Sequence, residues 1–386
     1  MNKDFIKTSF VLMLCQLSAG LFTPYLSLFL VDKVGFNNEE LGMYVLICGI
    51  SSFVLNLLIG VKSDNMLLTK KTVLLFSLAM SILGYSFLVF TQSFFVILII
   101  SVIFISFSTT LTTQIFSYAK YILKGDKEDY YISLLRIVVS ISWIVSPVIA
   151  SIIMRNSNYC LLVVGVVFWY LLSLFACIFL FSENDRCTEK ITIEKTHIKI
   201  RYIYIILSFL VFSLLQATNT IWNTNVPLYL IEHINVSKSF IGVISSINAI
   251  MEIPIIIIIS KLLDKCKVEK IIIIGIVLGS TLFVIFPQID NMYIVLILMT
   301  LKAAYGTSFI ALGMVFFHKI IPERIGLATA LYSNTNRVGS MIAGSIISLI
   351  GKNYNKMFTI LLIISLICMF YFICIVNKNK IYMRGE

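Results

Sequence analysis

The sequence is poor in charged residues, in proline and in histidine. Only 13% of its 386 residues are charged, and it contains six prolines and three histidines. Soluble domains carry about 25% charged residues. Hydrophobic residues make up 59% of the chain, which is more apolar side chain than a water-soluble protein of this length can bury. These proportions argue against secreted, disordered and fibrous classes and predict a polytopic membrane protein embedded in a lipid bilayer.

The chain also lacks the sequence patterns of several catalytic and metal-binding sites. Its eight cysteines include no CxxC pair and lie mostly in apolar runs, so they predict neither a metal site nor a disulfide framework. No GxxxxGK[ST] sequence is present, and no nucleophile elbow or sizeable soluble domain is found. We therefore expect no enzyme activity, no cofactor and no ATP site. Work done by such a protein must draw on an ion gradient.

Twelve apolar segments are long enough to cross a bilayer, which takes about 20 mainly apolar residues in a helix. They lie near residues 8–31, 41–61, 72–91, 94–118, 131–154, 158–181, 203–231, 239–260, 271–288, 292–317, 326–350 and 356–376. The connections are short except for the polar stretch 182–202. We expect an all-α membrane protein with an N-terminal six-helix bundle (1–181), a cytoplasmic linker (182–202) and a C-terminal six-helix bundle (203–386).

Positive charge is distributed unevenly between the two sides of these spans. With the N-terminus placed in the cytoplasm, 22 of the 30 Lys and Arg residues fall on the cytoplasmic side, five on the outer side and three inside spans. Cytoplasmic loops of membrane proteins are enriched in Lys and Arg. The bias predicts a multi-pass protein of the cell membrane with both termini in the cytoplasm. It also explains the net charge of +11 without any nucleic-acid partner.

The two predicted halves share an internal repeat at an offset of about 200 residues. The matched residues are Gln16 and Gln216, Gly42 and Gly242, Asp64 and Asp264, Lys70 and Lys270, and, one residue late, Arg136 and Arg337. Parallel repeats related by an axis along the membrane normal are a known transporter plan, in which the substrate site lies near the midplane at the repeat interface. The repeat therefore predicts twelve helices in two pseudo-symmetric halves, and a transport function.

The loop after the second span resembles the Gly-x-x-x-Asp-Arg-x-Gly-Arg-Lys signature of the major facilitator superfamily. Residues 60–64 read GVKSD, followed by a basic pair at 70–71, and the copy after the eighth span reads SKLLDK at 260–265. Both copies are degenerate, with Asn65 in place of Arg and Ser260 in place of Gly. The resemblance implies that Asp64 and Asp264 latch the inward gate. An acid near the N-terminus of a helix fits that role, because the helix end carries partial positive charge.

Three further segments resemble the sugar efflux transporter family within that superfamily. They are residues 135–147 in the fifth span, the sequence MEIP at 251–254 in the eighth, and ALYSNTNRVG at 330–339 in the eleventh. Together with the fold, the resemblance covers essentially the whole chain. It implies proton-driven export of small hydrophilic solutes and a central cavity lined by spans 1, 4, 5, 7, 8 and 11.

Ionisable side chains inside spans are expensive in hydrocarbon and usually face a cavity or a partner. Glu252 is the only carboxylate deep in any span, and we expect it to couple transport to protons. Arg337 lies about 11 residues into its span, too deep to reach the surface, and we expect it to pair with Glu252 or to bind substrate. A permanent structural ion pair of Glu252 with Arg337 or Lys302 is the alternative.

Several further polar side chains in the cavity-lining spans and the tenth span are candidate substrate ligands. Amides and hydroxyls can donate and accept hydrogen bonds, which suits a polyhydroxylated ligand, and a Trp ring offers a face for a pyranose. Ordinary interhelical hydrogen bonds are the alternative for each of these residues. The candidates are Gln16, Gln114, Arg136, Trp143, Asn219, Trp222, Asn223, Asn248, Lys302, Asn334 and Asn336.

These observations predict a secondary active transporter, expected to be a monomer, that exports sugars or glycosides by proton-coupled alternating access. A multidrug exporter with proton antiport on the same fold is the competing hypothesis. Drug pumps have mostly apolar and acidic cavities, whereas the polar residues here are mainly amides and cations. A membrane enzyme or sensor would need a catalytic constellation or a soluble domain, and neither is present in the sequence.

Overall fold

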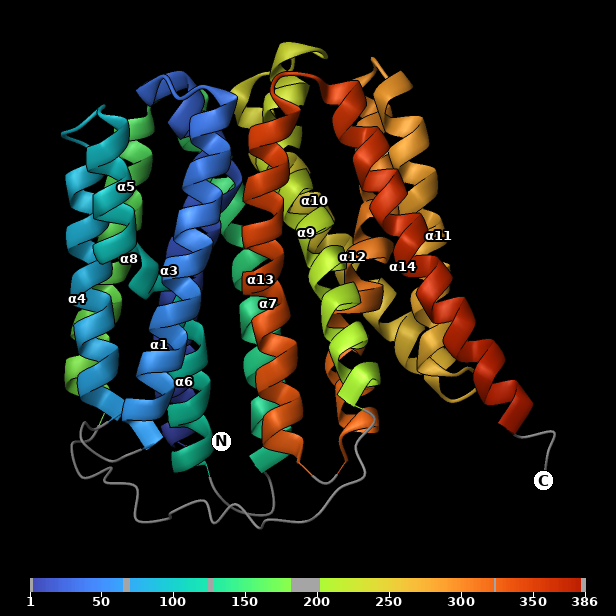
Figure 1. Cartoon of the computed structure of the whole chain (residues 1–386). Coiled ribbons are helices and arrows are strands. Elements are labelled where there is room, and N and C mark those ends of the chain that lie inside the picture. Colours follow the sequence, from blue (N-terminus) through green and yellow to red (C-terminus); the bar gives the residue numbers. More distant parts are fainter. Residues whose placement is uncertain (1–2, 65–69, 124–127, 182–201, 323, 383–386) are drawn as a thin grey trace. The chain divides into compact units, whose positions relative to one another are not determined.

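The computed structural model describes residues 3–64, 70–123, 128–181, 202–322 and 324–382 (Figure 1). Every regular element in these ranges is helical. Eleven helices, counted among the described residues, are long and apolar enough to cross a membrane. The remaining predicted span is α13 (Ile325–Ile350), a helix of 26 residues. The predicted all-α fold with twelve transmembrane helices is confirmed.

Regular α-helix is interrupted in two of the first six spans, the first and the fourth. Their elements are α1 (Lys3–Phe22), η1 (Thr23–Tyr25), α2 (Leu26–Leu28), η2 (Phe29–Val34), α3 (Asn38–Asp64), α4 (Lys70–Leu88), α5 (Phe94–Ile103), η3 (Ile105–Phe107), α6 (Ser108–Ile122), α7 (Glu128–Met154) and α8 (Tyr159–Leu180). In the first span Pro24 begins the 3-10 turn, because proline has no N–H to donate and its ring crowds the preceding turn. In the fourth span η3 separates α5 from α6 without a proline.

The break in the fourth span has a packing cause. Gly84 on α4 has no side chain, and an added Cβ there would collide with Phe104 and Ile105. The backbone at the break therefore lies directly against α4. This contact explains why a continuous apolar run folds as two helices rather than one.

The last six spans are nearly continuous helices. They are α9 (Tyr202–Glu232), α10 (Lys238–Leu263), α11 (Val268–Ile285) with η4 (Phe286–Gln288), α12 (Met292–Ile320), α13 and α14 (Tyr354–Tyr382). The small-residue pattern at Gly275 and Gly279 lies where α11 packs on α12. Side chains added at these positions would collide with Ser308 and Tyr305 respectively, so close helix approach requires glycine here.

The chain divides into two compact units. Unit 1 comprises Met1–Phe36, Ile50–Lys199 and Ser237–Ser246, and unit 2 comprises Asn37–Gly49, Ile200–Val236 and Ile247–Glu386. The start of α3 thus groups with unit 2 and the start of α10 with unit 1. The predicted linker 182–202 lies outside the described residues except for Tyr202, which begins α9. The division at this linker stays a prediction.

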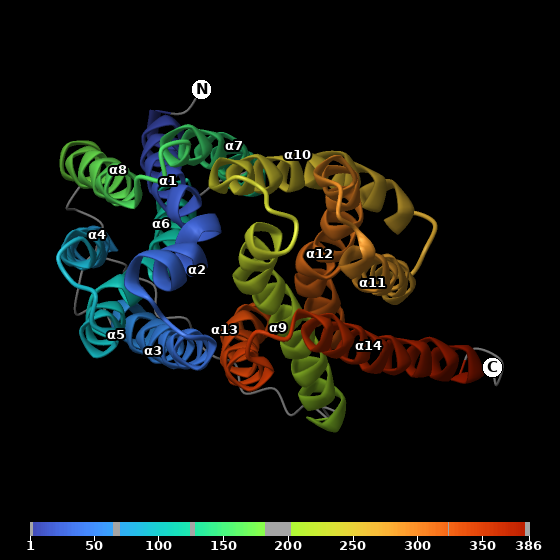
Figure 2. The same cartoon turned by 90° about the horizontal axis from the view of Figure 1, so that it is seen from above.

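The first helix of each six-span set packs against the fifth and the sixth. Within unit 1, α1 lies between α7 and α8, as Figure 2 shows. Within unit 2, α9 packs against α13 and α14, and α11 lies beside α12 and α14. The same neighbours recur in both sets, which is the packing that the sequence repeat predicts.

Candidate functional site

A buried glutamine organises the polar residues of unit 1. Gln16 on α1 is only 4% exposed. Its Nε2 donates to Thr112 Oγ1 on α6 at 2.7 Å, and its Oε1 accepts from Trp143 Nε1 on α7 at 3.0 Å. Both ends of the amide are therefore satisfied by side chains of other helices. The half-buried indole of Trp143 is held in a fixed orientation by this bond.

The other two predicted ligands of unit 1 are Gln114 and Arg136. Gln114 on α6 is buried, and its Oε1 has no hydrogen-bond partner among the described residues. Arg136 is exposed on α7, one helical turn before Ser140, whose hydroxyl donates to the Arg136 carbonyl. A buried acceptor without a partner is costly unless a ligand or water satisfies it. Gln114 is thus available to a donor group of a ligand.

The membrane carboxylate of unit 2 is bonded within its own helix. Asn248 Nδ2 donates to Glu252 Oε1 at 2.9 Å. The two residues lie four apart on α10 and so share one face of the helix. Glu252 is half-buried, and Asn248 Oδ1 is buried without a hydrogen-bond partner in the part of the chain that the structure describes. The carboxylate therefore keeps one oxygen free of a described protein donor, and the amide keeps one acceptor unused.

Lys302 is the cation that interacts electrostatically with Glu252. This lysine on α12 is 5% exposed, and its Nζ donates to Asn219 Oδ1 on α9 at 2.8 Å. In the described part of the chain no ion pair joins Glu252 to Arg337 or to Lys302. The structural pairing of Glu252 with Arg337 or with Lys302 therefore stays a prediction.

Arg337 instead bonds within α13. Its Nη1 donates to the Ser333 carbonyl at 3.1 Å and to Asn334 Oδ1 at 3.4 Å. The neighbouring Asn336 donates weakly to Gln216 Oε1 on α9 at 3.5 Å. A guanidinium carries five N–H donors, so most of its hydrogen-bonding capacity is not used by these two contacts.

Trp222 and Asn223 occupy different surroundings although they are adjacent on α9. Trp222 is 4% exposed and packs against Phe283, Phe286 and Phe358, with ring centroids 4.8–6.2 Å apart. Asn223 is exposed. The Trp222 ring is covered by aromatic neighbours, so the structure favours a packing role for it rather than contact with a sugar.

The two proposed gate acids lie at helix ends. Asp64 is the last residue of α3, and its side chain lies outside the described residues. Asp264 is exposed in the turn after α10. The gate role of each stays a prediction.

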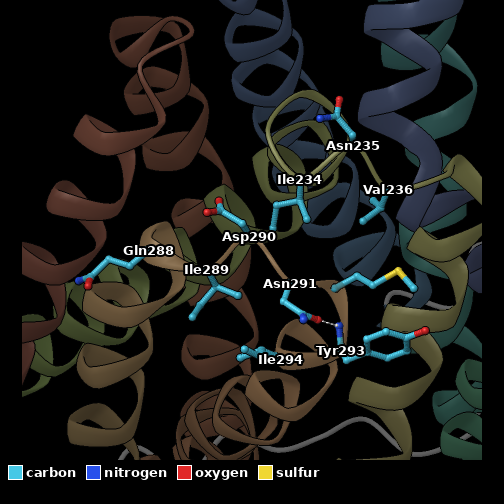
Figure 3. Close-up of a pocket in the computed structure, with 10 residues that line it drawn as sticks. Ile234, Asn235, Val236, Gln288, Ile289, Asp290, Asn291, Tyr293 and Ile294 are labelled. Atoms are coloured by element: carbon cyan, nitrogen blue, oxygen red, sulfur yellow. Dashed lines mark hydrogen bonds between the residues drawn. The ribbon is translucent and has the colours of Figure 1, made fainter.

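A cavity of about 560 Å³ lies in unit 2, away from all of these side chains (Figure 3). It is lined by the loop residues 234–236 and by residues 288–294. Within it, Asn291 Oδ1 accepts from the Tyr293 N–H at 2.8 Å and caps the start of α12. The Asn291 side chain thus caps a helix. We do not count this cavity as part of the candidate site.

Four residues that make polar contacts between helices were not predicted from the sequence. Thr112 holds Gln16, as described above. In unit 2 the buried Tyr305 hydroxyl bonds Thr218 at 2.6 Å and Ser365 at 3.4 Å, linking α12 to α9 and α14. Apart from their position within apolar spans, these residues carry no sequence signal that separates them from other hydroxyl side chains.

Comparison with known proteins identifies the family of this chain. Residues 5–362 match the MFS_1 like family. The chain belongs to this family of major facilitator transporters. It is 25% identical to sugar efflux transporter B of Salmonella typhimurium over 382 residues, a match that covers 95% of each chain. It is also 25% identical to sugar efflux transporter C of Escherichia coli, over 95% of this chain and 96% of that protein.

Solved structures share the fold of this MFS_1-like chain. The nucleoside transporter NupG superposes with a TM-score of 0.78 at 16% identity, over 97% of this chain and 99% of that one. The peptide transporter POT in complex with sulfate gives a TM-score of 0.81 at 11% identity, over 98% and 95% of the two chains. The chain is therefore a multi-pass membrane transporter with the major facilitator fold. Transporters of this kind are not enzymes.

Proposed function

We propose that this transporter exports small hydrophilic solutes, sugars or glycosides, in exchange for protons by alternating access. Two curated relatives that match 95% of the chain are named sugar efflux transporters. The observation that carries the proton role is the solitary carboxylate of Glu252, set between Asn248 and the attracted Lys302. The remaining polar groups supply the chemistry for an uncharged, hydroxyl-rich ligand.

The substrate ligands that we propose are amides, one indole ring and two guanidinium groups. Trp143 offers an indole that Gln16 orients, and Gln114 offers an unsatisfied acceptor. Arg337 offers unused donors. A sugar hydroxyl both donates and accepts, so it can satisfy each kind of group. We retain Arg136, Asn223, Asn334 and Asn336 as further proposed ligands, and Asp64 and Asp264 as proposed gate latches.

The proposal that Glu252 is the proton site rests on its position in the membrane and on the positive charge of Lys302. An ionised carboxylate deep in a span is disfavoured by the low dielectric, whereas an adjacent ammonium stabilises it. Opposed effects of similar size let such a group both take up and release a proton. Glu252 meets both conditions, because it lies within α10 and interacts electrostatically with Lys302. We further propose that the protein acts as a monomer in the cell membrane with both termini in the cytoplasm, on the 22-to-5 charge bias.

Reconstituted vesicles test this function directly. Counterflow of a panel of labelled neutral mono- and disaccharides and of labelled cationic drugs identifies the substrate class. We expect exchange of sugars, and exchange of drugs alone would contradict the proposal in favour of a multidrug exporter. Glu252→Gln should leave sugar counterflow intact while it abolishes accumulation driven by a pH gradient, because counterflow needs no net proton movement.

A matched control separates this effect from a general loss of carboxylate charge. Glu39 is exposed at the start of α3, and Glu39→Gln should retain gradient-driven transport. If Glu252→Gln also retains it, Glu252 does not couple transport to protons.

A further inference from the structure

Lys302 can interact with two acceptors, one of them neutral and the other a carboxylate that can bind a proton. Its ammonium donates to Asn219 at 2.8 Å and is attracted by the Glu252 carboxylate. At 5% exposure it has little access to water. A buried ammonium without a partner is strongly disfavoured, so loss of the Asn219 bond requires a new acceptor. The acceptor already attracted to it is Glu252.

Asn219 is accessible to a ligand. Its side chain is half-buried, whereas the lysine that it holds is buried. One helical turn from Glu252, the Asn248 Oδ1 is buried, and no described residue donates a hydrogen bond to it. A polyhydroxylated ligand can donate one hydroxyl to Asn219 Oδ1 and another to Asn248 Oδ1. A ligand hydroxyl bound in this way competes with the Lys302 ammonium for Asn219 Oδ1.

We propose that Lys302 links the two events of antiport: a sugar that takes over Asn219 drives Lys302 onto Glu252, and Glu252 then releases its proton. This inference rests on the proposed function and names the residue through which substrate and proton exclude each other. Lys302 is here a positioning residue that acts through Glu252.

The step balances in protons and charge. Before substrate binds, Glu252 is a neutral carboxylic acid and Lys302 an ammonium held by Asn219. Afterwards the O–H bond of Glu252 is broken, its proton has gone to water, and the resulting carboxylate pairs with the unchanged ammonium. The reverse holds by linkage: a proton on Glu252 must weaken sugar binding by the same factor by which sugar weakens proton binding.

Several other ionisable groups on the helices around Lys302 make polar contacts elsewhere. The helices that pack on α12 are α9, α11 and α13. Arg337 on α13 bonds Ser333 and Asn334, and Tyr332 donates to the Ile310 carbonyl. Glu269 at the start of α11 pairs with Lys319 at 2.9 Å. On α12 itself, Tyr305 bonds Thr218 and Ser365.

Proton release on sugar binding is the measurement that tests this linkage. The purified full-length protein is titrated with the sugar that gives the strongest counterflow, by calorimetry in two buffers of different ionisation enthalpy. We expect release of up to one proton per bound sugar in the wild type. Lys302→Met should still bind sugar but release none, and Lys302→Arg, which keeps the charge, should restore part of the release.

Two further variants test the coupling independently of Lys302, and each variant is checked for folding. Asn219→Leu keeps the lysine but removes its alternative acceptor, so it should also uncouple release from binding. Lys261→Met removes an exposed lysine from the last turn of α10 and should release protons as the wild type does. Size-exclusion chromatography and thermal unfolding identify any variant that is not folded.

The outcomes separate this inference from the proposed function. Release that persists in Lys302→Met or in Asn219→Leu overturns the role of Lys302. If Glu252→Gln abolishes release while Lys302→Met keeps it, the coupling carboxylate stands and only the lysine link is wrong. If Glu252→Gln itself still releases protons, the proposed proton site is wrong as well.

Discussion

Two tryptophans that the sequence treats alike have opposite surroundings in the structure. Trp222 is covered by three phenylalanines, whereas Trp143 is half-buried and held by Gln16. We therefore predict that Trp222→Ala acts on stability and that Trp143→Ala acts on sugar binding.

The sizes follow from the contacts that each substitution removes. Truncation of a fully buried Trp costs about 3–5 kcal/mol through lost burial and the cavity left behind, and each of the ring pairs adds about 0.5–1.5 kcal/mol to the burial of Trp222. For Trp143 the lost hydrogen bond is worth about 0.6 kcal/mol inside a membrane protein. If a sugar ring stacks on the indole with the energy of one ring contact, its removal weakens binding about 2- to 13-fold.

Thermal unfolding in detergent and equilibrium binding of the labelled sugar measure the two effects separately. Trp222→Ala should lower the unfolding temperature much more than Trp143→Ala, and should retain sugar affinity at temperatures where it is folded. Trp143→Phe keeps an aromatic face while it removes the Nε1–H, so its affinity should fall less than that of Trp143→Ala. Loss of affinity in a thermally unaffected Trp222→Ala protein would refute this division of roles.

Two packing predictions use the same unfolding assay. Gly279→Ala should destabilise the protein by about 1–3 kcal/mol, because its Cβ meets the fully buried ring of Tyr305. The control Gly165→Ala meets only the flexible ends of Leu21 and Ile153 and should be neutral or stabilising. Equal losses in the two variants would contradict the packing argument. Lys319→Ala should destabilise the protein by about 1–3 kcal/mol, because it leaves the buried Glu269 carboxylate unpaired. Adding Glu269→Gln should recover part of this loss. No recovery would show that the unpaired charge is not the cause.

Most of the fold could be predicted from the sequence because the bilayer imposes a simple rule on length and hydropathy. Each predicted span coincides with a helix within a few residues. The 3-10 break between α5 and α6 could not be predicted, because it depends on Gly84 of another helix rather than on a local proline. The grouping of the starts of α3 and α10 with the other unit likewise depends on tertiary packing.

The members of the candidate site stay predictions, and few of the hydrogen bonds between them could be predicted from the sequence. The bond from Asn248 to Glu252 was readable in principle, since residues four apart on a helix face each other. The bond from Lys302 to Asn219 joins residues 83 apart, and no periodicity brings them together. From the sequence we considered Arg337 and Lys302 as partners of Glu252, because all three are deep in spans and the charges are opposite. In the structure Lys302 interacts electrostatically with Glu252, and Arg337 donates within its own helix.

The internal repeat shows how one scaffold supports two kinds of chemistry. Gln16 and Gln216 lie on the first helix of each six-span set, and each accepts a bond from the fifth. In unit 1 the donor is an indole held at 3.0 Å, so the glutamine serves to orient a ring. In unit 2 the donor is Asn336 at 3.5 Å, a weaker contact, and the charged residues Glu252 and Lys302 lie on other helices of that unit. Because a ring contact is insensitive to pH and a carboxylate is not, we expect substitutions in unit 1 to change sugar affinity at every pH, and those at Glu252 and Lys302 to change its dependence on pH.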